Sequence, residues 1–146
     1  MTGDSGDPYQ MERFVAAQDR GGAYQRALAE LRAGLKVSHW VWFIFPQIAG
    51  LGFSAMTREY AISSLAEAQA YLAHPVLAPR LAECAAALLA VDGKSAEDIL
   101  GPVDAMKVRS SMTLFQAAVP GEAVFADVLD RYYGGNADDA TVRRLR

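Results

Sequence analysis

The sequence has few of the residues that cross-link small proteins or bind metals in them. Its 146 residues include one cysteine, Cys84, and two histidines, His39 and His74. A single cysteine cannot form an internal disulfide, and its place in an apolar run predicts a buried, unreactive thiol in a reducing compartment. The histidines lie 35 positions apart, without the paired spacing of a zinc site. We therefore expect neither a metal nor a cofactor.

An excess of positive charge and a long apolar run are missing too. The chain carries 14 Lys and Arg against 17 Asp and Glu, a net charge of −3. A surface that binds nucleic acid in general needs an excess of positively charged residues to neutralise phosphates, so we expect no nucleic-acid partner. The longest run of large apolar side chains, residues 40–45, is far shorter than the roughly 20 residues that span a membrane. The first seven residues lack the pattern of a secretion signal. We predict a cytoplasmic protein without a membrane partner.

What the sequence does have is enough apolar material for one domain, with 52% hydrophobic and 21% charged residues. We expect a mobile tail over residues 1–7 and a single all-α domain of about six to seven helices over residues 8–146. Helical periodicity is clearest at Leu77, Leu81, Cys84, Leu88 and Val91. Ser64 and Glu67 have the spacing of a capping box. Other helix boundaries are predicted at Asp7-Pro8, Gly21-Gly22, Gly34, Ser54, Gly101-Pro102 and Gly134-Gly135.

Residues 38–47 hold both tryptophans, and Gly50 and Gly52 follow them. Six consecutive β-formers favour a buried strand by propensity. No second convincing strand exists to pair with it, and an unpaired buried strand leaves its backbone groups unsatisfied. We therefore predict a short buried helix here, capped by Ser38 and ended before Pro46. The glycine turn after it lacks the patterns of phosphate loops and reads as a connection between helices.

The same run contains candidate ligand-binding side chains. The indoles of Trp40 and Trp42 could stack on a flat ligand while His39 donates a hydrogen bond or shuttles a proton. Gln47 could bind a polar edge of that ligand. The alternative is that the aromatic side chains are core and His39 makes one structural hydrogen bond, which is the commoner role of aromatic clusters.

A second candidate group is polar and lies on one predicted helix. Asp104, Lys107 and Ser111 recur at spacings of three and four, so they form one stripe beside an apolar face. Lys107 and Arg109, with the hydroxyls of Ser110, Ser111 and Thr113, could hold a phosphate or a carboxylate. The alternative is a weak surface pair between Asp104 and Lys107.

Catalytic residues are not identified by any motif. Glu59, Glu83 and Asp104 could serve as acid or base, but nothing in the sequence pairs any two of them. Cys84 in its apolar stripe is a poor nucleophile. The sequence leaves open whether the protein is an enzyme.

Several segments together carry a family resemblance. They are Arg13-Phe14 with Ala17-Gln18, residues 38–47, Gly50-Leu51-Gly52, Tyr60-Ala61-Ile62, residues 68–72 with His74-Pro75, Lys107 with residues 110–115, and residues 132–135. From about Met11 to Leu145, the chain resembles the bacterial family named domain of unknown function 1810. The resemblance implies a multihelical single domain and no established activity. Some members are labelled calpastatin, a class of disordered inhibitors that this apolar sequence does not resemble.

A looser resemblance, around His74 to Leu89, is to the NADAR domains, which are small and helical and act on ADP-ribose-type nucleotides. Fold analogy is a poor guide to function, and no catalytic residue follows from it. Our leading hypothesis is a cleft between residues 38–47 and 107–113 that binds a small anionic or nucleotide-like ligand. It fails if the two segments lie more than a side-chain length apart. The alternatives are an enzyme, an N-glycosidase or hydrolase, acting on ADP-ribose-type nucleotides, and a protein-interaction module without a small ligand. The oligomeric state stays open.

Overall fold

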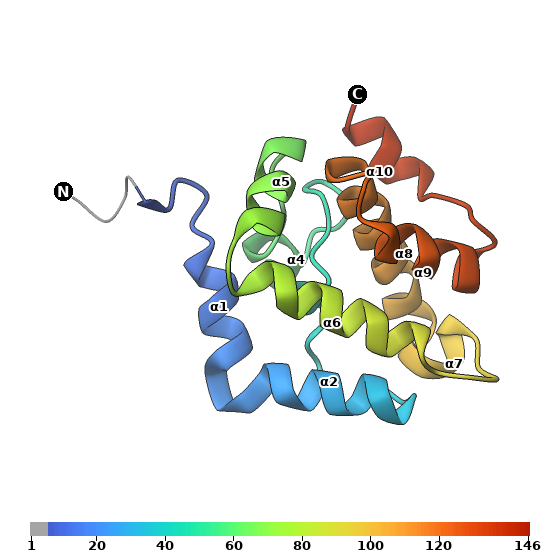
Figure 1. Ribbon diagram of the computed structural model, residues 1–146. Coiled ribbons are helices and arrows are strands. Elements are labelled where there is room, and N and C mark those ends of the chain that lie inside the picture. The colour runs from blue at the N-terminus through green and yellow to red at the C-terminus, as the bar shows by residue number, and fades with distance from the viewer. Residues whose placement is uncertain (1–5) are drawn as a thin grey trace.

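The computed structural model describes residues 6–146, and these form a compact bundle of helices (Figure 1). Within that range lie α1 (Glu12–Asp19), the 3₁₀ segment η2 (Arg20–Gly22), α2 (Ala23–Ala33), α3 (Val41–Ile44), α4 (Ala55–Glu59), α5 (Leu65–Ala73), α6 (Leu77–Leu89), α7 (Ala96–Leu100), α8 (Pro102–Ala118), α9 (Ala123–Tyr133) and α10 (Asp139–Arg144). The predicted mostly helical fold is confirmed. The helices outnumber the six to seven expected because α3, α4, α7 and α10 are short segments of six residues or fewer.

The longest helix, α8, is the centre of the fold. It packs against α9, α5, α7, α10 and α3, while α6 packs against both α2 and α9. In Figure 1, α6 crosses the front of the molecule above α2, and α8, α9 and α10 gather on the opposite side from α1. The long helix is thereby covered on several sides, so its polar residues reach solvent only where its neighbours leave a gap.

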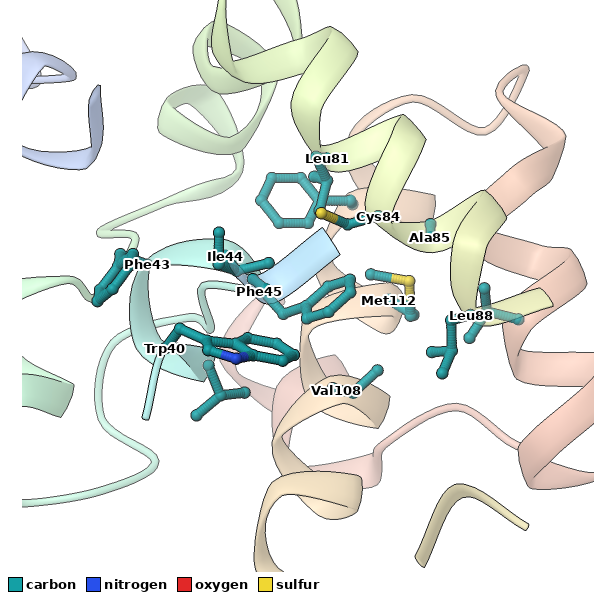
Figure 2. Packing of buried hydrophobic residues seen from close by; sticks show 14 of the residues in the cluster. Trp40, Phe43, Ile44, Phe45, Leu81, Cys84, Ala85, Leu88, Val108 and Met112 are labelled. Carbon is teal, nitrogen blue, oxygen red and sulfur yellow. The ribbon is translucent and has the colours of Figure 1, made fainter. Parts of the chain in front are cut away.

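The aromatic run supplies much of the core between α3, α6 and α8. Trp40 and Phe45 are buried with exposed fractions of 1% and 0%, and their ring centroids lie 6.3 Å apart. Figure 2 shows both side chains beside Val108 and Met112 of α8, with Cys84 and the leucines of α6 on the other side. Cys84 is buried as predicted, and burial raises the pKa of its thiol to about 12.

Within residues 38–47, Val41–Ile44 form the predicted short helix and no strand forms, but the predicted cap is wrong. The helix α3 follows Trp40, which makes no side-chain cap hydrogen bond, and the Ser38 hydroxyl donates instead to the Glu30 carboxylate at 2.7 Å. In residues 6–146, extended pairing is limited to one isolated parallel bridge between Ile48 and Ile62.

Other helix ends follow local sequence rules, with two corrections. Gly34 ends α2 with a φ of +74°, and Ser54 caps α4 through the Thr57 N–H. The capping box at α5 is only half formed. Ser64 accepts from the Glu67 N–H, but the Glu67 carboxylate turns to Ser63 and pairs with Arg13 at 3.1 Å.

The first helix starts later than the Asp7-Pro8 pair predicts. The Asp7 carboxylate accepts N–H groups of Met11 and Glu12, at 2.6 Å and 3.1 Å, and α1 begins at Glu12. The intervening residues form a turn in which Gln10 has a φ of +56°. Of the predicted tail, residues 1–5 lie outside the described residues.

In residues 6–146, no single helix is long and apolar enough to span a membrane. Only α5 and α6 taken together, across a bend of 92°, would reach the required length and apolar composition.

Candidate functional site

A surface cleft of about 270 Å³ lies where α8 faces the segment after α3 and the start of α10. Its walls bring together residues from three distant parts of the chain. They are Gln47, Leu51, Gly52, Thr57, Val103, Met106, Lys107, Ser110, Asp138 and Ala140. Three of these, Gln47, Lys107 and Ser110, were predicted as ligand-binding residues.

The wall that carries Gln47 is fixed by backbone pairing. The Ile62 N–H donates to the Gln47 carbonyl, and the Ala49 N–H donates to the Ile62 carbonyl, both at 2.8 Å. This pairing holds the segment after α3 against the one before α5. The Gln47 side chain lines the cleft, and its amide makes no hydrogen bond within residues 6–146.

The opposite wall is fastened where α10 begins. Asp138 caps α10, and its Oδ2 accepts from the Thr141 N–H, the Thr141 hydroxyl and the Ser110 hydroxyl, at 3.1, 2.6 and 3.0 Å. Arg109 donates to the carbonyls of Asn136 and Ala137 at 2.9 Å and 3.0 Å. Arg109 therefore holds the loop between α9 and α10, and it does not line the cleft as an anion-binding group.

Lys107 is the positive charge of the cleft. Its Nζ lies 5.2 Å from the ring centroid of Trp42, a cation–π distance, and 3.7 Å from Oδ1 of Asp104. The contact with Trp42 shows that residues 38–47 and 107–113 meet within a side-chain length. Trp42 supports Lys107 on one face of its ring instead of offering that face to a ligand.

Asp104 is shared between two lysines. Its Oδ2 lies 2.8 Å from Nζ of Lys36, a side chain that is 7% exposed. Lys36 also lies 5.0 Å from the ring of Trp40 and donates to the carbonyl of Ser38 at 2.6 Å. Since the closer ion pair belongs to Lys36, one carboxylate balances two ammonium groups, and a positive charge remains at Lys107.

The remaining predicted residues lie elsewhere. Trp40 is buried, and its Nε1 donates to Glu30 at 2.9 Å, so it belongs to the core. Ser111 is fully buried on the inner face of α8. His39 is exposed and is not among the cleft residues. Asp104 and Trp42 act on the cleft through Lys107.

Glu30 organises the chain that leads into α3. Its carboxylate accepts the N–H groups of Val37 and Ser38, the Ser38 hydroxyl and the indole N–H of Trp40. Partial burial raises the pKa of this carboxyl, but the four hydrogen bonds outweigh burial and lower the pKa from 4.5 to about 2. The charged Glu30 side chain thus fixes the segment from Val37 to Trp40 that leads into α3.

Two buried polar atoms lack hydrogen-bond partners within the described residues. They are Nε1 of Trp42 and Oγ of Ser111. Each unpaired buried group costs about 1–3 kcal/mol, so both lower the stability of the α3–α8 packing.

Carboxylates and metal ligands are sparse around the cleft. Of its lining residues, Asp138 alone is acidic. Glu83 lies away from it, hydrogen-bonded to Tyr24 and 3.6 Å from Arg32, and Glu59 is exposed outside the cleft. Residues 6–146 contain no group of three or more His, Cys, Asp or Glu arranged to hold a metal ion.

Sequence reasoning missed the cleft residues that come from the turn after α3, from α4 and from α10. No ligand-binding motif marks Leu51, Thr57 or Asp138 in the sequence, and only folding places them beside α8. One available signal was Met106, a large apolar side chain on the polar side of α8, which is 72% exposed.

Comparison with known proteins adds a family and a structural relative. The family model described as "Protein of unknown function (DUF1810)" matches residues 8–145. The crystal structure of the conserved hypothetical protein Rv1873 from Mycobacterium tuberculosis is similar at 50% sequence identity and a TM-score of 0.92. The match covers 95% of this chain and 98% of that one. No curated protein matches this chain.

Proposed function

The chain belongs to the DUF1810 family of proteins of unknown function, and we propose that its cleft binds a small anionic or nucleotide-like ligand. The proposal rests on Lys107, a cation at the cleft wall. In residues 6–146 its only contact with a carboxylate is at 3.7 Å to Asp104, which also pairs more closely with Lys36. An ammonium group held in this way retains N–H donors for a phosphate or carboxylate oxygen.

The rest of the lining suits a ligand with an apolar body. Leu51, Val103 and Met106 offer apolar contact, while the amide of Gln47 is free to bind a polar edge. A cleft of about 270 Å³ lies at the small end of ligand sites. A metabolite-sized anion fits this description better than a macromolecule does.

The aromatic stacking expected from the sequence has no support in this cleft. No tryptophan lines it, because Trp40 is buried and Trp42 lies under Lys107. We therefore assign recognition to charge and hydrogen bonding instead of ring stacking.

A catalytic role would have to use Asp138, since that is the acidic side chain of the cleft. Its Oδ2 already accepts three hydrogen bonds, and it caps α10. The bonding assigns Asp138 a structural role and favours binding over hydrolysis. Incubation with ADP-ribose-type nucleotides tests the alternative directly, because release of base or ribose would establish an enzyme.

Thermal shift tests the binding proposal. The wild-type protein is screened against small carboxylates, phosphates and nucleotides, and each hit is repeated with Lys107→Gln. A ligand at a hundredfold its dissociation constant adds about 2.7 kcal/mol, which is roughly 5–10 °C for a domain of this size. The variant should lose most of this shift.

Arg20→Gln is the matched control, because Arg20 is exposed at η2 and removing it also deletes one positive charge. Equal loss of the shift in both variants would assign the effect to net charge and contradict the proposal. Shifts that survive Lys107→Gln unchanged would also contradict it.

A further inference from the structure

We propose that the cleft continues into a second anion subsite formed by Arg143 and Arg144, so that its ligand carries an anionic group at each end. This inference rests on the proposed function, because Lys107 supplies the first subsite. The observations that carry it concern a neighbouring hollow, two arginines without partners, and a glycine that makes room for one of them.

The hollow adjoins the cleft directly. It is lined by Gly50, Leu51, Ala140, Arg143 and Arg144, and it shares Leu51 and Ala140 with the cleft. The two depressions therefore adjoin at Leu51 and Ala140, and together they are called the groove here. One end of the groove lies at Lys107 and Asp138, and the other lies at the last turn of α10.

The two arginines have unused donors. Neither guanidinium forms a hydrogen bond or an ion pair in residues 6–146. By contrast, Arg109 on the facing helix donates to two carbonyls and Arg13 pairs with Glu67. A cation in the last turn of a helix interacts favourably with its dipole, but that effect does not use the guanidinium N–H groups. A phosphate or carboxylate would use them in bidentate fashion.

Gly50 leaves open the space that the Arg144 side chain occupies. A Cβ at residue 50 would lie 2.4 Å from Cζ of Arg144, so the guanidinium occupies the space that any other side chain would fill. Gly50 also has a φ of +96°, which other residues adopt only with strain. The guanidinium therefore lies close to the backbone of the same loop that forms the cleft wall.

The spacing of the charges sets the length of the ligand. Ser110, one turn after Lys107 on α8, bonds to Asp138 at the start of α10. Six residues separate Asp138 from Arg144, which corresponds to roughly 9 Å along a helix. The backbone that carries the second cationic end is thus displaced by about 9 Å from the Ser110–Asp138 contact that carries the first. That separation calls for an elongated dianion with an apolar middle against Leu51 and Ala140.

Asp138 also lines this groove, and Asp139 is exposed beside it. The three hydrogen bonds to Oδ2 of Asp138 disperse part of its charge. Against these two carboxylates stand Lys107, Arg143 and Arg144, so the groove retains a positive balance of one.

Linear dicarboxylates and matched monocarboxylates, from four to ten carbons, test the inference by calorimetric titration of the full chain. Bisphosphonates and monophosphonates of matched length form a second arm, which tells carboxylate from phosphate preference. At the length that spans the groove, we expect the dianion to bind about tenfold more tightly than the monoanion. Arg144→Gln should remove this advantage and leave the monoanion unaffected.

Lys107→Gln should weaken both ligands, and Arg20→Gln should weaken neither. Gly50→Ala gives a second route to the same result, because it displaces the guanidinium without removing its charge. An unchanged ratio of dianion to monoanion affinity in Arg144→Gln overturns the inference, as does a series in which no dianion exceeds its monoanion. Monoanion binding that does not depend on Lys107 overturns the proposed function instead.

Discussion

Replacing Glu30 by glutamine should destabilise the protein through the segment that leads into α3. The carboxylate of Glu30 accepts four hydrogen bonds, three of them at one oxygen. Glutamine keeps the size of the side chain, but its NH₂ group replaces one of the two oxygens that accept these hydrogen bonds. An NH₂ group cannot accept a hydrogen bond from the donors that face it. At least one donor then loses its partner, and the negative charge that attracts all four is gone.

The magnitude follows from the pKa of the carboxyl. Its fall from 4.5 to about 2 on folding corresponds to at most roughly 3 kcal/mol of stability. Glu30 is half-buried, so solvent screening reduces this value and we expect a loss of about 2 kcal/mol. In thermal unfolding that amounts to roughly 4–8 °C.

The stabilisation by Glu30 should also decrease as the pH falls. The folded-state pKa is lower than the unfolded one, so the contribution of Glu30 is present in full above about pH 5. It is lost as the pH falls from there toward 2. The wild type and Glu30→Gln should differ at pH 7, and more than half of the ionisation-linked difference should have gone by pH 3.

Urea unfolding followed by circular dichroism at pH 7 and pH 3 measures both free energies. Glu122→Gln is the control, since Glu122 is exposed and makes no side-chain cap hydrogen bond. A Glu30→Gln protein as stable as the wild type at pH 7 would refute the reasoning. So would a difference that stays the same at both pH values, because it would exclude the charge as its source.

Further predictions concern the N-terminal ion pair and the thiol. Glu67→Gln should lower the free energy of unfolding in urea by about 1.5–3 kcal/mol, because it removes a charged hydrogen-bond acceptor that is 4% exposed and pairs with Arg13; a loss below 1 kcal/mol would contradict this. Cys84 should react with a thiol reagent at pH 8 only as fast as the protein unfolds, since burial raises its pKa to about 12. Labelling of the folded protein at the rate of a free thiol would show that the side chain is accessible.

The helices could be predicted because their signals are local. Gly34, Ser54 and Gly134 end or start helices through contacts within a few positions of themselves, and the α6 stripe repeats at helical spacing. Two of the errors came where a more distant side chain competed for a local group. Glu67 turned to Arg13 instead of completing its capping box, and Ser38 turned to Glu30.

The candidate site also contains residues that the sequence predicted correctly and residues that it did not. Lys107 and Ser110 could be chosen from the sequence because they lie on one side of a predicted helix beside an apolar face. Ser111 was chosen from the same stripe and Trp40 from the aromatic run, yet both are buried. Spacing along a helix gives the relative direction of side chains, and only the packing of neighbouring helices decides which direction stays open to solvent.

The sequence by itself determined that this chain is mostly helical, belongs to its family and concentrates its aromatic side chains before Pro46. These properties depend on residue type and on neighbours three or four positions away. Only the tertiary structure decided that Lys107 lies over Trp42, that Asp104 is shared with Lys36, and that α10 closes the groove. Those contacts join residues that are far apart along the chain, and they form because α8 is buried among helices whose order in space the local pattern does not encode.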